Sequence, residues 1–283
     1  MGATGVAAPS GPMEDMPVGF DRNLAQRRSD FGVPEPFAAE AFSDALRAIF
    51  AAHRPSRMPF FRRVMTLPHA VASDPHFLGQ VHLNYQSAMH ALRAAAYRLP
   101  YLDSPQLRRR KLRLLYDDDG LPAAATCHHR LSDAFRNLGA ALVLDDEEFG
   151  EPEEMCCWLD GETAHFVRLA ESLYARSLGP WCILAAMSVD WMTALAEAFA
   201  VHFPQFRDEP YFADCLAQRR GEHYPAEALA VTQIVLRARP ELLPAAVHDA
   251  EAIAEALDGV WTQLDRIARN ASALIAPRRG RWG

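Results

Sequence analysis

The chain has 283 residues, 50% of them hydrophobic and 23% charged, which is an ordinary composition for a soluble globular protein. Its formal net charge of −7 and its pI of about 5.9 exclude the broad basic face that nucleic-acid binding usually needs. The longest apolar run, Trp181 to Leu195, is too short to span a bilayer and contains Asp190, so we expect neither a nucleic-acid nor a membrane partner.

Residues 1–36 are rich in glycine, proline and alanine without apolar periodicity, which is typical of a flexible N-terminal arm. From residue 37 to 275 apolar residues recur at helical spacing. An acidic loop interrupts this pattern at 144–154, and a basic tail follows it at 276–283. The pattern predicts helices over residues 36–53, 76–100, 104–120, 121–139, 156–177, 180–203, 209–238 and 245–272.

The connections between these helices decide the fold class. We find no strand alternation, hairpin turn, phosphate-binding glycine loop or internal repeat. Short loops between long amphipathic helices predict an all-α protein with one helical bundle over residues 37–275.

The cysteines and the start of the chain bear on its location. Five cysteines, an odd number without a C-x-x-C pair, favour a reducing cytosol over a disulfide scaffold. The start MGATGVAAPSGPMEDM lacks the basic residues and apolar core of a secretory signal, so we expect a cytoplasmic protein. A single lysine beside abundant alanine is associated with bacterial genomes rich in G and C.

One stretch combines carboxylates with imidazoles. Asp118 and Asp119 end one expected helix, and His128 and His129 lie ten residues later in the next. Only His128 falls on the apolar stripe of that helix, so we expect it to point into the bundle and His129 to point toward solvent. The turn residues between the helices let Asp118 or Asp119 approach His128. A buried histidine that is simply satisfied by a neighbour is the alternative.

Asp190 is the second candidate. It lies in a helix so apolar that it must be buried nearly all round, and a buried carboxylate must be paired, protonated or bound to metal. Glu197 follows two turns later on the same face. An ion pair between Asp190 and an arginine of another helix is the alternative to a metal.

The third candidate is the sequence GEHYPAEAL. If the helix runs through Pro225, His223 and Glu227 are four residues apart and can present two ligands to one ion. An exposed helix start with Pro225 at its first position is the alternative.

Further candidates lie on other helices. His90 shares a stripe with Gln86 and Arg93, while Glu162 and His165 form the E-x-x-H pair that di-iron bundles use. Together the candidates predict inward carboxylates and imidazoles on four or five helices. Such ligands without cysteine suit Fe(II) or Mn(II) better than structural zinc.

From about residue 76 to 236 the chain resembles the haem-oxygenase-like di-iron oxidases and oxygenases, relatives of the TenA and PqqC folds. The resemblance rests on the succession of four stretches, LPYLDSPQLRRRKLRLLYDDDG, HHRLSDAFRNLG, MSVDW and YFADCLAQRRGEHYPAEAL. It implies a haem-oxygenase-like bundle.

The ligands of that family map onto this chain only in part. The acid-to-histidine step falls on Asp118 and His128, or on Asp119 and His129, and the buried acid falls on Asp190. The first-helix glutamate has no acidic match, although His90 or Gln86 stands nearby. In the last H-x-x-x-D-x-x-H motif, either His223 and Glu227 are the first two members and Ala230 replaces the third, or His223 is the last and Arg220 and Leu216 replace the others.

The resemblance implies an enzyme of specialised metabolism that binds one or two Fe(II) ions and uses O2 to oxidise a small, amino-acid-like substrate. Arg93, Arg219 or Arg220 would receive a substrate carboxylate, because a guanidinium matches it. The alternatives are a cofactor-independent or haem-binding enzyme of the same fold, and a non-enzymatic bundle that binds a ligand or partner protein. A homodimer remains an option.

Overall fold

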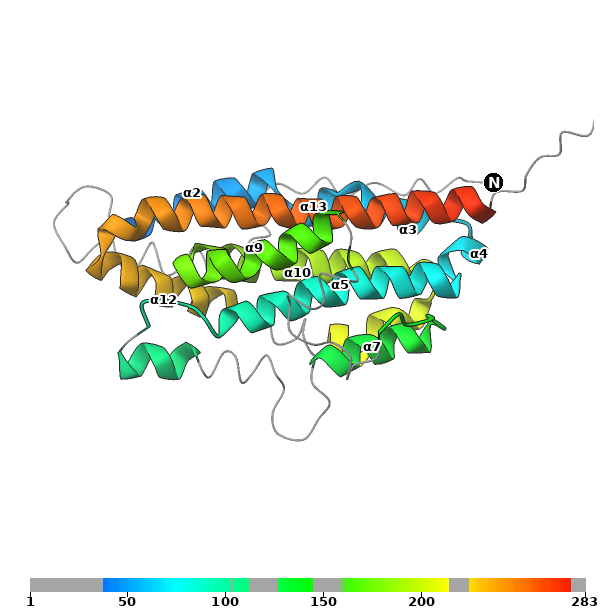
Figure 1. The fold of residues 1–283 in the computed structure, drawn as a ribbon, viewed down its shortest axis with the longest axis horizontal. Helices are drawn as coiled ribbons and strands as arrows, with labels where there is room; N and C mark the ends of the chain where they lie inside the picture. The colour runs from blue at the N-terminus through cyan, green and yellow to red at the C-terminus, as the bar shows by residue number, and fades with distance from the viewer. Residues whose placement is uncertain are drawn as a thin grey trace, which may run out of the picture. The chain divides into compact units, whose positions relative to one another are not determined.

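The computed structural model describes residues 38–102, 104–111, 127–144, 159, 161–213 and 224–275, without the side chains of 127–129, 274 and 275. These residues form helices and contain no strand, which confirms the all-α prediction (Figure 1). In chain order the labelled elements are α2 (Ala38–Ala52), η1 (Pro55–Arg57), α3 (Pro59–Thr66), α4 (His69–Ala72), α5 (Pro75–Ala96), α7 (Cys127–Asn137), α9 (Gly161–Arg176), α10 (Gly179–Ala200), η3 (Pro204–Asp208), α12 (Tyr224–Ala238), η4 (Pro240–Leu242) and α13 (Leu243–Ile275).

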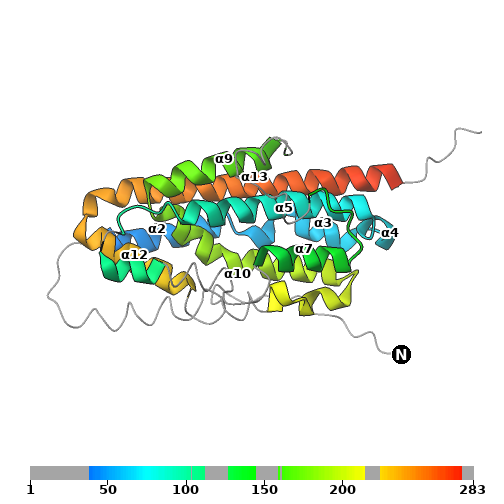
Figure 2. The same cartoon turned by 60° about the horizontal axis from the view of Figure 1, so that its bottom comes forward.

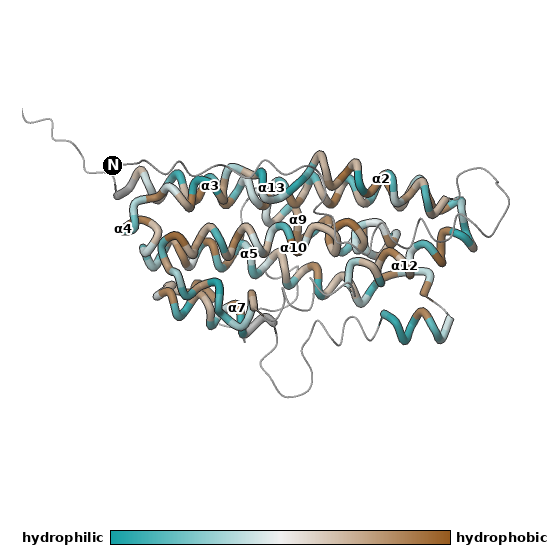
Figure 3. The backbone as a smooth tube through the Cα atoms, turned by 180° about the vertical axis from the view of Figure 1, so that it is seen from behind, coloured by the Kyte–Doolittle hydropathy of each residue, from teal (hydrophilic) through white to brown (hydrophobic). Residues whose placement is uncertain are grey.

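The long helix α13 organises the bundle. It packs against α2, α3, α5, α9 and α10, as Figure 1 shows for the helices that run alongside it. Apolar side chains repeat every three or four residues along its buried face, which is the spacing of an amphipathic helix. These are Ala246, Ala250, Ile253, Leu257, Val260, Trp261, Leu264 and Ala268. In Figure 3 hydrophobic and hydrophilic residues alternate along the helices, as this kind of packing requires.

Helix α10 is a core helix. Its length and composition would allow it to cross a membrane, but most of it is buried inside the bundle, with apolar residues on every side. It contacts α9, α12 and α13 as well as the N-terminal helices α2 and α3. The helix of Asp190 is therefore mostly buried, as expected, but not all round: Asp190 and Thr193 are half-buried and Glu197, on the same face, is exposed.

Two helices run antiparallel to α5. Phe199 of α10 packs against Phe77, and Trp191 of α10 donates a hydrogen bond to Tyr85. Residue numbers therefore rise along α5 as they fall along α10. α7 also packs against α5 (Figure 2): Ser132 of α7 lies beside His82, and just after α7 the amide N of Ala141 donates to the carbonyl O of Pro75 at 2.9 Å. These contacts define which residues of the three helices share a level of the bundle.

The sequence analysis did not anticipate the elements between residues 54 and 75. The structure has η1, α3 and α4 in this segment, and a proline stands at the start of each (Pro55, Pro59 and Pro68). Proline suits the first helical turn but not the interior, so successive prolines divide the segment into pieces too short for a clear periodicity. α5 then begins at the N-cap Asp74, whose carboxylate accepts from two backbone amides.

Pro36–Gly283 forms one compact unit, separate from Met1–Glu35. The expected arm, 1–36, and the tail, 276–283, lie outside the described residues. The expected single bundle over 37–275 falls within the second unit.

The contact between α10 and α13 gives a stability test. A Cβ added at Gly179 would lie 1.8 Å from the carbonyl O of Ala246, and backbone cannot move aside as a flexible side chain can. We expect Gly179→Ala to lower the free energy of unfolding by about 1–3 kcal/mol through overpacking. Urea denaturation followed by far-UV circular dichroism measures it.

Gly259→Ala is the matched control. The three atoms nearest to a Cβ at Gly259 would be side-chain atoms of Glu162, the nearest at 3.2 Å. In a helix interior alanine is more favourable than glycine by roughly 1 kcal/mol. We expect this variant to be as stable as the wild type or more so. Equal destabilisation by both changes would contradict the close backbone approach at Gly179.

Candidate functional site

Asp190 forms an ion pair with Arg54, which lies just after α2. Its Oδ1 accepts hydrogen bonds from Arg54 Nε at 2.9 Å and Ser56 Oγ at 3.0 Å, and its Oδ2 accepts from the amide N of Ser56 at 2.7 Å. The side chain is 10% exposed, so the carboxylate is largely buried and within reach of an arginine, as expected. The geometry supports the ion-pair alternative, because both oxygens are already engaged.

A second carboxylate, that of Asp258, binds the same segment of the chain. His53, directly after α2, bonds through Nδ1 to Asp258 Oδ2 on α13 at 2.7 Å. Burial raises the pKa of Asp258, and the bond to His53 opposes this shift. Residues 53–56 are therefore tied to α13 and α10 at once, by one carboxylate from each helix.

Asp190, Gln86 and the first turn of α7 lie at about the same height along the bundle, but the side chain of Asp190 does not point toward the other two. The contacts of α5 with α10 put Asp190 level with Gln86, and those of α5 with α7 put the first turn of α7, which contains His128 and His129, near the same level. Yet Asp190 points to Arg54, while its neighbour Trp191 points to Tyr85 on α5. Because neighbouring residues of a helix point about 100° apart, Asp190 points in a different direction from the residue that meets α5.

The face of α5 that carries His90 runs from the core to the surface. Gln86 is buried, His90 and Arg93 are half-buried, and Tyr97 is exposed. His90 lies one helical turn, about 6 Å, beyond Gln86 and therefore close to the level of the first turn of α7. An imidazole and a guanidinium thus share a partly enclosed face of α5.

Three secondary candidates lie at the surface. Glu162 and His165 are exposed on α9, and Glu197 is exposed on α10. The expectation that these three side chains face the interior is wrong. The reason is geometric: the E-x-x-H spacing puts two residues on one face of a helix but does not decide which face is buried.

Glu227 lies on another side of the molecule. It forms an ion pair with Arg110, 3.2 Å between Nε and Oε1, and both side chains are partly exposed. Near it, Trp181 Nε1 donates to Tyr224 Oη at 3.3 Å, more than two turns along α10 from Asp190. Glu227 and Asp190 are therefore not brought together.

Several candidates cannot be compared with the geometry. Asp118, Asp119, His223, Arg219 and Arg220 lie outside the described residues. For His128 and His129 the structure describes only the backbone. Their predicted orientations and their metal binding stay predictions, as does metal binding by His90. Over the ranges that are described, no three His, Cys, Asp or Glu side chains cluster as a metal site would.

The structure contains buried polar contacts that the sequence analysis missed. His82 Nε2 lies 2.9 Å from Ser132 Oγ between α5 and α7, with both residues fully buried. Trp191 Nε1 donates to Tyr85 Oη at 3.2 Å, and Tyr85 Oη lies 3.1 Å from Tyr211 Oη. The sequence signal that could have identified these contacts is a polar side chain on the apolar stripe of a helix, which is the criterion by which His128 was chosen.

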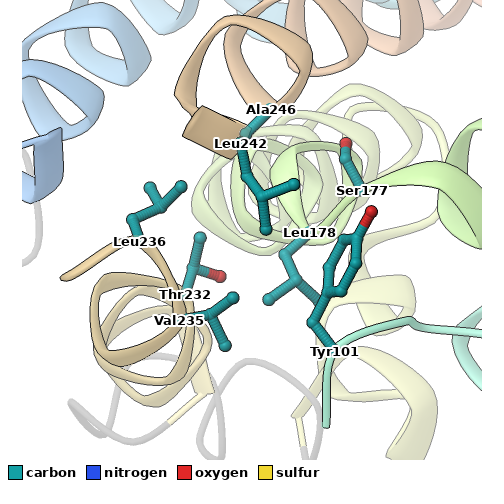
Figure 4. A pocket seen from close by; sticks show the side chains of 8 residues that line it. All are labelled: Tyr101, Ser177, Leu178, Thr232, Val235, Leu236, Leu242 and Ala246. Carbon is teal, nitrogen blue, oxygen red and sulfur yellow. The ribbon is translucent and has the colours of Figure 1, made fainter. Parts of the chain in front are cut away.

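A small apolar pocket opens where the α9–α10 turn meets α12, η4 and the start of α13. Figure 4 shows its lining: Tyr101, Ser177, Leu178, Thr232, Val235, Leu236, Leu242 and Ala246. Its empty space is about 200 Å³, part of it open solvent. Arg239 stacks on the Tyr101 ring, 4.7 Å from its centroid. None of the residues predicted to bind metal lines this pocket, so it is separate from the candidate site on α5.

No protein-family model matches this chain, and neither curated proteins nor solved structures show significant similarity to it. The resemblance to haem-oxygenase-like enzymes therefore stays a prediction.

Removing either partner of the Asp190 ion pair should destabilise the fold. Asp190→Ala removes the ion-pair partner of the Arg54 guanidinium, and Arg54→Ala leaves a largely buried carboxylate without its ion-pair partner. We expect each to lower the free energy of unfolding by about 1–3 kcal/mol, and the double variant to lose less than the sum of the two. Urea titration of all three variants measures the coupling. Glu197→Ala, exposed on the same helix, should change stability little, and strictly additive losses would disprove the pairing.

Cys182 provides a chemical test of the core. It is fully buried against Thr232 and Ala228, and burial raises the pKa of its thiol to about 12. Because only the thiolate alkylates quickly, we expect iodoacetamide at pH 8 to leave Cys182 unmodified in the native protein and to label it in urea. Peptide mass spectrometry measures the alkylation of Cys182 separately from that of the other cysteines. Rapid native labelling would contradict the burial.

Proposed function

We propose that the chain is a cytoplasmic O2-dependent oxidoreductase that binds iron on the α5–α7 side of its bundle and oxidises a small, amino-acid-like substrate. The observation that carries the proposal is the partly enclosed face of α5 with His90 and Arg93, which lies within about one helical turn of the start of α7.

The proposed division of labour follows from side-chain chemistry. His90 offers an imidazole nitrogen, and His128, with Asp118 or Asp119, would add ligands from the adjoining segment; bound iron would supply the activation of O2. Arg93 follows His90 by three residues on the same face, so its guanidinium is suited to orient a substrate carboxylate beside the metal. Asp190 has a structural part in this proposal, because Arg54 and Ser56 engage both its oxygens.

A metal-free bundle that binds a ligand or partner is the second candidate. It is favoured by the engagement of Asp190 with Arg54, which gives this buried acid a structural part. A haem-binding relative would instead display a Soret absorption band.

Iron content separates these candidates. Protein purified from iron-supplemented cells should contain iron by elemental analysis, and His90→Ala and His128→Ala should each lose most of it with unchanged far-UV circular dichroism. His129→Ala and Asp190→Asn are the controls and should keep their iron. Equal loss in the His128 and His129 variants would disprove the predicted facing, and an iron-free wild type would favour the metal-free candidate.

A further inference from the structure

Two histidines meet at the end of the bundle where α10 finishes, away from the candidate site. His69 is the first residue of α4, and His202 lies two residues after the last residue of α10. Their ring centroids are 6.0 Å apart with an interplanar angle of 36°. His69 is exposed and His202 is half-buried, so both residues are at least partly accessible to solvent.

The partner of His202 determines which of its nitrogens is available. Its Nε2 lies 2.7 Å from the carbonyl O of Val64, and a carbonyl can only accept a hydrogen bond. Nε2 therefore carries the proton and Nδ1 carries the lone pair in the neutral ring. Metal-binding histidines are usually oriented in this way, with the second ring nitrogen donating to a carbonyl or carboxylate.

The separation of the two rings fits a shared ion. With Zn–N bonds of about 2.0–2.1 Å and angles near or above tetrahedral, the centroids of two imidazoles on one zinc lie roughly 5–6 Å apart. The ring centroid of Phe203 lies 5.7 Å from that of His69 and 6.4 Å from that of His202, so an aromatic ring packs beside both histidines. The separation of the two imidazole centroids, 6.0 Å, falls within the range for two rings on one ion.

We propose that His69 and His202 form a surface site for a divalent transition metal of borderline softness, such as Zn²⁺. The two imidazoles supply two ligands and water completes the coordination. Imidazole nitrogen suits zinc, copper and nickel, whereas oxygen-seeking Mg²⁺ and Ca²⁺ prefer carboxylates. The site is independent of the proposed iron centre, since it shares no residue with it.

Equilibrium dialysis against Zn²⁺ with elemental analysis tests the site, on full-length protein from which any polyhistidine tag has been removed. We expect His69→Ala and His202→Gln each to bind one zinc equivalent fewer than the wild type. Glutamine at position 202 can still donate an amide N–H to Val64, so the fold is preserved while the Nδ1 ligand is lost.

Two variants separate this result from other zinc binding. His248→Ala, an exposed histidine on α13, should bind as much zinc as the wild type. His90→Ala should keep the same equivalent, even if it loses iron, so a failure of the proposed function leaves this test intact. The proposal is overturned if His69→Ala and His202→Gln bind as much zinc as the wild type, or if His248→Ala loses the same equivalent.

Discussion

A charge inside an apolar helix is the constraint on which much of this structure depends. Most of α10 is buried inside the bundle, and Asp190 lies near its middle with a side chain that is 10% exposed. An unpaired carboxylate in such a place would be far too costly, so the chain must supply compensating groups there. Arg54 and Ser56 do so from the segment between α2 and α3, which ties the first helices of the bundle to its core.

The same constraint limits the chemistry that Asp190 can perform. A carboxylate that already accepts three hydrogen bonds, one of them from a guanidinium, is a poor metal ligand, because most of its lone pairs are used and the neighbouring positive charge repels a cation. The direction of Asp190 follows from the 100° turn per residue of a helix: Trp191 points to Tyr85 on α5, and Asp190 points to another side. The face of α5 with His90 and Arg93 is thereby separated from the acid at the same level.

Close contacts elsewhere hold these levels in register. The aromatic residues of α5, α7, α10 and η3 pack together around Phe77, Phe135, Phe199 and Phe206, and the hydroxyls of Tyr85 and Tyr211 meet in the same core. Gly79 and Gly179 let backbones approach where any side chain would collide with a carbonyl oxygen. Slippage of α5 against α7 or α10 would break several of these contacts at once, so the positions of His90 and of the start of α7 are coupled.

Local sequence determined the helical class, most of the helices and the burial of Asp190, because the 3.6-residue period and the cost of a buried charge act within one segment. It could not determine the partner of Asp190, since Arg54 lies 136 residues away and nothing local marks it. It misjudged Glu162, His165 and Glu197, because spacing identifies a shared face and only the packing of neighbouring helices decides whether that face is buried. The pairing of His69 with His202 likewise arises only when the end of α10 meets α4, which is a consequence of tertiary packing.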